Sequence, residues 1–103
     1  TLNLALNYGS KEEIINAFKV FIKGDKKEIN VKNFEKNLYT RDIPDPEILI
    51  RTGGTNRLSN FLLWQLAYTE IFFVDKLWPD FNKKDFNKIT NKFYNIKRNF
   101  GKI

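Results

Sequence analysis

The chain has 103 residues, which is enough for one small domain or for part of one. It contains neither cysteine nor histidine, which excludes disulfides, thiolate zinc sites and the commonest general base. Its net charge of +6 suits an anionic ligand, and any divalent ion must be held by oxygen atoms, which favours magnesium over zinc.

The first expected element is a strand at residues 2–6, because leucine alternates there with other residues. The chain starts inside this pattern and shows no signal peptide, so we expect a piece of a longer chain. A helix is expected from Ser10, which has capping-box spacing to Glu13, to a stop at Gly24. Its apolar stripe comprises Ile14, Ile15, Phe18, Phe21 and Ile22.

A charged loop at residues 25–28 is expected to precede a short helix that Asn30 caps. After an extended connection at 42–46, residues 47–51 are apolar on both faces, as in a buried parallel strand. Ser59 is expected to cap a helix from Asn60 to about Leu66.

Residues 69–74, rich in β-branched and aromatic side chains, predict a third strand, followed by a turn at 77–79. Asn82 is expected to cap a last long helix with an apolar stripe of Phe86, Ile89, Phe93, Ile96 and Phe100. This alternation predicts an α/β fold in which a parallel-stranded sheet is flanked by helices.

The segment 50–65 carries the clearest functional pattern. A strand ending in Arg51 is followed by Gly53, Gly54, Arg57 and Ser59. Strand, glycine loop and helix start gather backbone N–H groups around an anion, and guanidinium groups suit phosphate oxygens. The sequence therefore predicts a diphosphate site; the alternative is that Arg51 only pairs with a nearby carboxylate and Ser59 only caps a helix.

Residues 50–65, continued by 67–70 and 77–81, resemble the C-terminal signature of cis-prenyltransferases of the undecaprenyl diphosphate synthase type. Residues 7–9 with the following Glu13-Ile14 resemble an earlier signature, and residues 98–101 resemble the tail. The resemblance implies the C-terminal portion of that fold. It also implies that Arg51, Arg57 and Ser59 bind the diphosphate of isopentenyl diphosphate, together with Asn7, Gly53 and Gly54.

Glu70 is the metal candidate. Without the resemblance it would be an exposed glutamate on an edge strand, whereas the resemblance implies a part in a site for Mg²⁺ and diphosphate. No catalytic residue is expected in these residues, because the family's Asp-Gly-Asn-Gly-Arg loop with its essential aspartate does not occur. We therefore expect 1–103 to be a single partial domain that is inactive alone.

Four positions depart from the family pattern. Ser10 and Lys11 stand where a second glycine and an arginine are usual, and Thr55 stands at a usually acidic position. In the tail, Asn99 replaces the usual arginine, and Arg98 lies one residue earlier. A carboxylate role at position 55 cannot be carried over.

The resemblance further implies elongation of an allylic diphosphate, usually farnesyl diphosphate, by isopentenyl diphosphate units with cis geometry, yielding a polyprenyl lipid carrier. It implies a cytoplasmic homodimer, without nucleic acid, that touches membranes through its lipid product. Two alternatives stay open: a small basic nucleic-acid-binding module and a purely structural dimerisation fragment. For the former, the candidate base-stacking residues are Phe61, Trp64, Tyr68, Phe72, Phe73 and Trp78, which we expect to serve a core or dimer contact instead.

Overall fold

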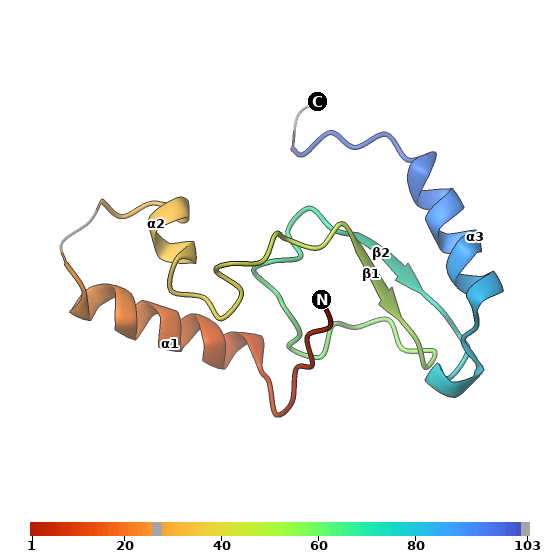
Figure 1. Ribbon diagram of the computed structural model, residues 1–103, viewed down its shortest axis with the longest axis horizontal. Helices are drawn as coiled ribbons and strands as arrows, with labels where there is room; N and C mark the ends of the chain where they lie inside the picture. The colour runs from red at the N-terminus through yellow and green to blue at the C-terminus, as the bar shows by residue number, and fades with distance from the viewer. Residues whose placement is uncertain (26–27, 102–103) are drawn as a thin grey trace. The chain divides into compact units, whose positions relative to one another are not determined.

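A computed structural model describes residues 1–25 and 28–101 of the chain. Its elements are α1 (Ser10–Lys23), α2 (Val31–Glu35), β1 (Ile48–Arg51), β2 (Glu70–Phe73), the 3₁₀ helix η1 (Trp78–Asp80) and α3 (Lys83–Tyr94) (Figure 1). The chain divides into two compact units, Thr1–Asp45 with Ser59–Trp64 and Pro46–Leu58 with Gln65–Ile103. Parallel strands together with helices confirm the predicted α/β class.

The first unit contains α1 and α2. α1 begins at Ser10 and stops before Gly24, as predicted. α2 also begins where predicted, because the side chain of Asn30 accepts the N–H of Asn33 at 2.8 Å and so caps the helix. The charged loop predicted at 25–28 lies partly outside the described residues.

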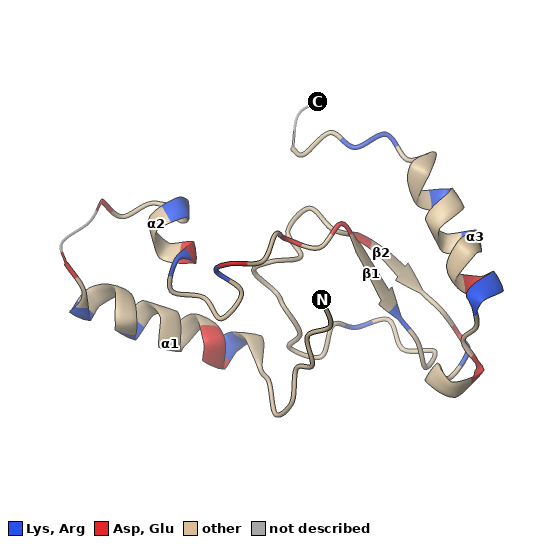
Figure 2. Ribbon diagram, viewed as in Figure 1, with Lys and Arg blue, Asp and Glu red and all other residues tan. Residues whose placement is uncertain are grey.

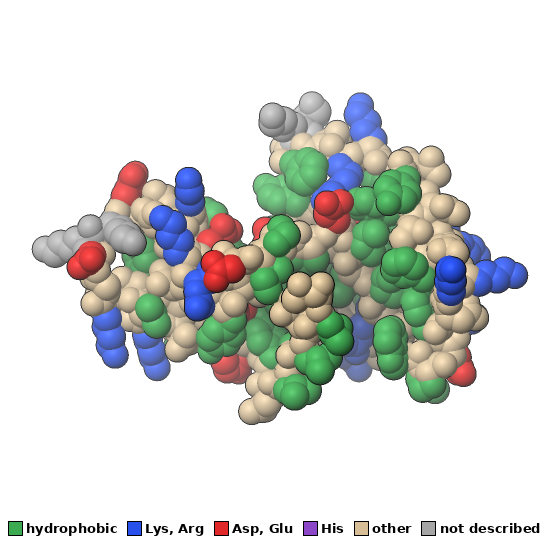
Figure 3. Space-filling model, viewed as in Figure 1, with side chains coloured by type: hydrophobic (Ala, Val, Ile, Leu, Met, Phe, Trp, Pro, Cys, Tyr) green, Lys and Arg blue, Asp and Glu red, His purple; other side chains and the backbone are tan. Residues whose placement is uncertain are grey.

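Each unit has a small core. In the first unit Ala17 and Leu38 are buried, and in the second Leu66 and Ile89 are buried. Hydrophobic side chains also reach the surface of both units (Figure 3). Those with the highest exposed fractions are Ile29, Leu2, Leu6, Tyr94, Leu4 and Trp78. Among the described residues, no helix combines the length and apolarity needed to cross a bilayer.

The second unit is built on β1 and β2, which pair in parallel from Ile48 with Glu70 to Arg51 with Phe73. Both predicted strands are thus confirmed. Because the strands are parallel, their carboxyl ends lie at the same edge of the sheet, where Arg51 and Phe73 are located. The side chains of β1 are half-buried rather than fully buried.

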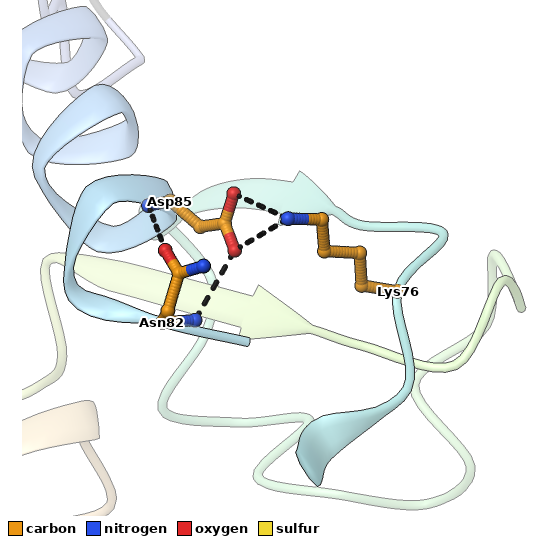
Figure 4. Close-up of polar contacts among 3 residues, drawn as sticks. All are labelled: Lys76, Asn82 and Asp85. Atoms are coloured by element: carbon orange, nitrogen blue, oxygen red, sulfur yellow. Dashed lines mark hydrogen bonds and ion pairs between the residues drawn. The ribbon is translucent and has the colours of Figure 1, made fainter. Parts of the chain in front are cut away.

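A network of polar contacts fixes the start of α3. Asn82 and Asp85 form a reciprocal capping box, in which each side chain accepts the backbone N–H of the other residue. The ammonium group of Lys76 donates to both carboxylate oxygens of Asp85 at 3.0 Å (Figure 4). The predicted helix cap is therefore confirmed. The helix ends at Tyr94, however, so Ile96 and Phe100 of the predicted apolar stripe lie beyond it.

Two predicted elements are absent from the described residues. Residues 2–6 form no strand, because no described strand pairs with them, and a strand needs a partner for its backbone groups. No helix covers residues 60–66 either. Ser59, Asn60 and Leu62 have φ values of 50°, 62° and 46°, which lie in the left-handed region that a right-handed helix cannot contain.

Candidate phosphate-binding site

Arg51 is the last residue of β1, at the carboxyl edge of the sheet, where ligands bind in open α/β sheets. Its guanidinium group is anchored on Thr55, to whose hydroxyl oxygen Nε and Nη2 donate at 3.0 and 2.9 Å. Among the described residues, no carboxylate lies within 4.0 Å of the guanidinium nitrogens of Arg51 or Arg57. The predicted alternative, a pair between Arg51 and a nearby carboxylate, is absent there.

The glycine loop after β1 joins the segment that follows β2. The N–H of Gly53 donates to the carbonyl of Lys76 at 2.8 Å, and that of Gly54 donates to the carbonyl of Val74 at 3.2 Å. Both glycines have positive φ, 94° and 72°, which other residues rarely adopt. Their conformation shapes the loop, and their amides are already used.

The prediction that backbone amides of this loop and of a following helix surround an anion is therefore wrong in its detail. The two glycine amides have carbonyl acceptors, and the next helical element described after the loop, η1, begins only at Trp78. Among the side chains of segment 51–59, the predicted anion donors are the guanidinium groups of Arg51 and Arg57 and the hydroxyl of Ser59. Arg57 and Ser59 are both exposed.

Ser59 belongs to the first unit, where the next residue caps α1. The carbonyl of Asn60 accepts the N–H of Ser10 at 2.7 Å, and its side-chain oxygen accepts the N–H of Lys11 at 2.9 Å. The N–H of Leu63 in turn donates to the hydroxyl of Ser10 at 2.9 Å. Ser10 therefore does not form the predicted capping box with Glu13, because Asn60 supplies the cap from a distant segment.

Asn7 also belongs to the first unit, where it is exposed and has a φ of 50°. The next residue, Tyr8, donates its hydroxyl hydrogen to the carboxylate of the buried Glu13. Burial, followed by this hydrogen bond, raises the pKa of Tyr8 to about 12. Glu13 also accepts the N–H of Tyr39 at 2.8 Å, so it organises the core of this unit.

Glu70 is the first residue of β2 and pairs with Ile48, at the opposite end of the two-stranded ladder from Arg51. The two ends are three residue steps apart along the strand, a distance of roughly 10 Å at the usual rise per residue. The second unit therefore brings Arg51 together with the two glycines and Thr55, but it does not bring Glu70 to them.

Arg98 occupies the Glu70 end of the sheet. Its Nη2 donates to the carbonyl of Tyr68 at 2.7 Å, and its guanidinium lies 3.7 Å from Glu47 and 4.0 Å from Glu70. The same group stacks on the ring of Phe100, 4.5 Å from its centroid. These contacts hold the tail that follows α3 against the start of both strands.

The Glu70 carboxylate fits a single ligand of a magnesium ion. It is a hard oxygen donor, its side chain is 33% exposed, and its contact with Arg98 is at the limit of an ion pair. Within residues 1–25 and 28–101, no three acidic, histidine or cysteine side chains cluster as a metal site. Magnesium at Glu70 therefore requires further ligands, and substrate phosphate is the kind of oxygen ligand that this ion favours.

Reasoning from sequence missed the functions of Thr55 and Asn60. In the sequence, Thr55 differs from the family pattern at a usually acidic position. No local sequence pattern predicts the hydrogen bond between its hydroxyl and Arg51. Asn60 is paired with residues 48 and 49 positions away, beyond the reach of any local pattern.

The paired parallel strands and the helices place the chain among the α/β proteins, with Arg51 and the glycine loop at the carboxyl edge of the sheet. Residues 1–101 match the family model described as "Putative undecaprenyl diphosphate synthase". The chain belongs to this prenyltransferase family.

Curated relatives support the assignment over the whole chain. The isoprenyl transferase of Fusobacterium nucleatum is 48% identical over 103 residues, which are 100% of this chain and 44% of the relative. That of Thermotoga maritima is 47% identical over 105 residues, covering 98% of this chain and 45% of the relative. This chain thus spans under half the length of these relatives.

Solved structures agree. A "probable undecaprenyl diphosphate synthase" from Campylobacter jejuni superposes with a TM-score of 0.86 at 43% identity, covering 96% of this chain and 46% of that one. Lavandulyl diphosphate synthase from Lavandula x intermedia, solved in complex with dimethylallyl diphosphate, gives a TM-score of 0.87 at 37% identity. It covers 95% of this chain and 45% of the lavender chain. The resemblance stated from sequence is confirmed.

Proposed function

We propose that this chain supplies the isopentenyl diphosphate site of a cis-prenyltransferase, which extends an allylic diphosphate such as farnesyl diphosphate to a polyprenyl diphosphate lipid carrier. The observation that carries the proposal is the guanidinium of Arg51, which is anchored at the carboxyl edge of the sheet and has no carboxylate partner among the described residues. Such a group retains its charge and several donors for phosphate oxygens.

The chain's own residues bind and orient the substrate. Arg51 and Arg57 neutralise the diphosphate, Ser59 donates to a phosphate oxygen, and Gly53 and Gly54 give the loop its shape. Asn7 is a further candidate contact. Holding the alkene of isopentenyl diphosphate near the allylic carbon is catalysis by orientation, to which preorganised charge contributes.

Glu70 would hold magnesium together with substrate phosphate, and the bound ion would supply charge neutralisation for the departing diphosphate. The essential aspartate of the resembling family is not among these residues, so we propose that the chain is inactive alone. We further propose a cytoplasmic homodimer, supported by the exposed apolar side chains of both units (Figure 3). Contact with a membrane would come through the lipid product.

An exchange experiment tests the activity. This chain replaces the matched residues of the Fusobacterium nucleatum relative, and incorporation of labelled isopentenyl diphosphate into polyprenyl products is measured with farnesyl diphosphate and magnesium. We expect product from the chimera, none from the 103-residue chain alone, loss with Arg51→Ala and little change with Lys84→Ala. Product from the chain alone would refute its proposed inactivity, and an inactive chimera that folds and dimerises would count against the function itself.

The alternative of a nucleic-acid module has less support. Basic residues are spread over α1, α2 and α3 alike (Figure 2), and the one row at helical spacing along α3 consists of Lys84, Lys88 and Lys92. Nucleic-acid binding would weaken steeply with added salt and grow with polymer length. Diphosphate binding saturates at one site per chain and weakens with Arg57→Ala.

A further inference from the structure

The side chain of Thr55 turns back over the glycine loop to meet Arg51. Both hydrogen bonds to its hydroxyl oxygen come from one edge of the guanidinium, through Nε and Nη2. A guanidinium group has five N–H donors. Two are used here, so three remain for a ligand.

Thr55 is a neutral acceptor, and this distinguishes Arg51 from Arg41 and Arg98. Arg41 lies 3.8 Å from Asp42, and Arg98 lies beside Glu47 and Glu70. An arginine beside a carboxylate presents little net charge to an incoming anion, whereas an arginine held by a hydroxyl presents all of it. The anchor therefore fixes the direction of Arg51 without cancelling its charge.

We propose that Thr55 is a positioning residue that holds Arg51 ready for a free diphosphate group and lowers the site's need for a metal ion. This proposal rests on the proposed function, because it assumes that Arg51 meets diphosphate. A guanidinium fixed before binding loses less side-chain freedom when the ligand arrives. The hydroxyl of Thr55 also keeps its own hydrogen, which is a further donor for a phosphate oxygen.

Three variants separate direction from charge. Thr55→Val has a similar shape but no hydroxyl, Thr55→Ser keeps the hydroxyl, and Thr55→Glu gives Arg51 a charged acceptor. The first measurement needs no ligand: it is hydrogen exchange of the Arg51 Nε–H, followed by NMR. The second is the Kd for isopentenyl diphosphate and for inorganic diphosphate, with and without magnesium.

We expect Thr55→Val to speed exchange of the Arg51 Nε–H and to raise the Kd about tenfold, or ~1.4 kcal/mol. Thr55→Ser restores both quantities. Thr55→Glu keeps the slow exchange, weakens binding without magnesium and recovers affinity when magnesium is added. Arg57→Ala, the matched control, weakens binding and leaves the exchange of the Arg51 Nε–H unchanged.

Unchanged exchange in Thr55→Val would overturn the anchor, and faster exchange with an unchanged Kd would overturn the positioning role. Equal magnesium dependence in wild type and Thr55→Glu would overturn the part played by charge. A wild-type chain that binds neither probe, with Arg51→Ala no different, would remove the proposed function and this proposal with it. The two failures are therefore distinguishable.

Discussion

The side-chain amide of Asn60 donates to the carboxylate of Glu12 at 2.9 Å, although 48 residues separate the two in sequence. Asn60 also accepts the N–H groups of Ser10 and Lys11 through its two oxygens, so it caps α1 from outside the helix. The residue before it is Ser59, a proposed phosphate ligand with left-handed backbone. The cap thereby stabilises the backbone on which Ser59 lies.

We call the contacts of Asn60 with Ser10, Lys11 and Glu12 the clamp. Substitution of Asn60 should weaken it. Asn60→Ala removes the side-chain part of the cap of α1 and is expected to lower the free energy of unfolding by about 1 kcal/mol. Asn60→Asp keeps the acceptor for Lys11 but places a carboxylate against that of Glu12, so it should also destabilise. Adding Glu12→Gln to Asn60→Asp restores a donor and an acceptor and should recover stability.

Urea unfolding followed by circular dichroism measures each variant. Asn91→Ala on α3, where the side chain is exposed, is the control. A double variant no more stable than Asn60→Asp would show that the contact between positions 12 and 60 contributes nothing to folding.

The clamp also explains why Gly9 precedes α1. A Cβ atom at Gly9 would lie 2.2 Å from the carboxylate of Glu12 and 2.9 Å from the amide nitrogen of Asn60. Gly9→Ala should therefore push these two side chains apart and destabilise the protein. In an Asn60→Ala, Glu12→Ala background the same substitution should have little effect, because the clashing atoms are gone.

Thermal unfolding of the four combinations gives the coupling between the sites. Gly24→Ala is the matched control, because the nearest neighbour of a Cβ there would be the carbonyl oxygen of Val20, at 3.6 Å. Additive effects of Gly9→Ala and the clamp substitutions would argue against steric coupling.

The raised pKa of Tyr8 predicts a loss of stability at alkaline pH. Its pKa is raised from 10.0 to about 12, first by burial and then by its bond to Glu13, so the folded chain holds the phenolic proton more tightly than the unfolded chain does. The stabilisation is complete below pH 10 and is lost as the pH rises through about 12. Tyr8→Phe has no such proton, so the gap in unfolding free energy between wild type and this variant should shrink over this range. Tyr94→Phe, at an 81% exposed position, should leave the alkaline decline in place.

The lowered pKa of Asp85 predicts that stability falls at acid pH. Its pKa is lowered, chiefly by the hydrogen bond from the Lys76 side chain and then by that from the Asn82 backbone. The stabilisation is present above the ordinary carboxyl range and is lost as the pH falls through the lowered pKa. Asp85→Asn should therefore melt at a lower temperature than wild type at about pH 7, with the two converging at about pH 2. Asp80→Asn is the control, and a gap that persists in acid would contradict the account.

Local signals predicted much of this fold. Asn30 and Asn82 sit directly before their helices, so the caps could be read from sequence. The apolar residues of β1 and β2 predicted two strands of a parallel sheet, and the two strands do pair in parallel. The helix predicted after Ser59 failed for a tertiary reason, because Asn60 is drawn into left-handed backbone where it caps α1, a contact that local propensity does not contain.

The candidate site was predicted only in part. The place of Arg51 followed from its position at the end of a strand. The use of the Gly53 and Gly54 amides did not, because their acceptors come from the segment after β2. Thr55 could not be recognised as a partner, since only the folded loop brings its hydroxyl to the guanidinium.

The most direct test is an amide-resolved NMR titration of the chain with isopentenyl diphosphate, with and without magnesium. We expect saturable shifts, at one site per chain, centred on Arg51, Thr55, Arg57 and Ser59, and their loss in Arg51→Ala. A well-dispersed spectrum in which these resonances stay still while the ligand is added in excess would contradict it.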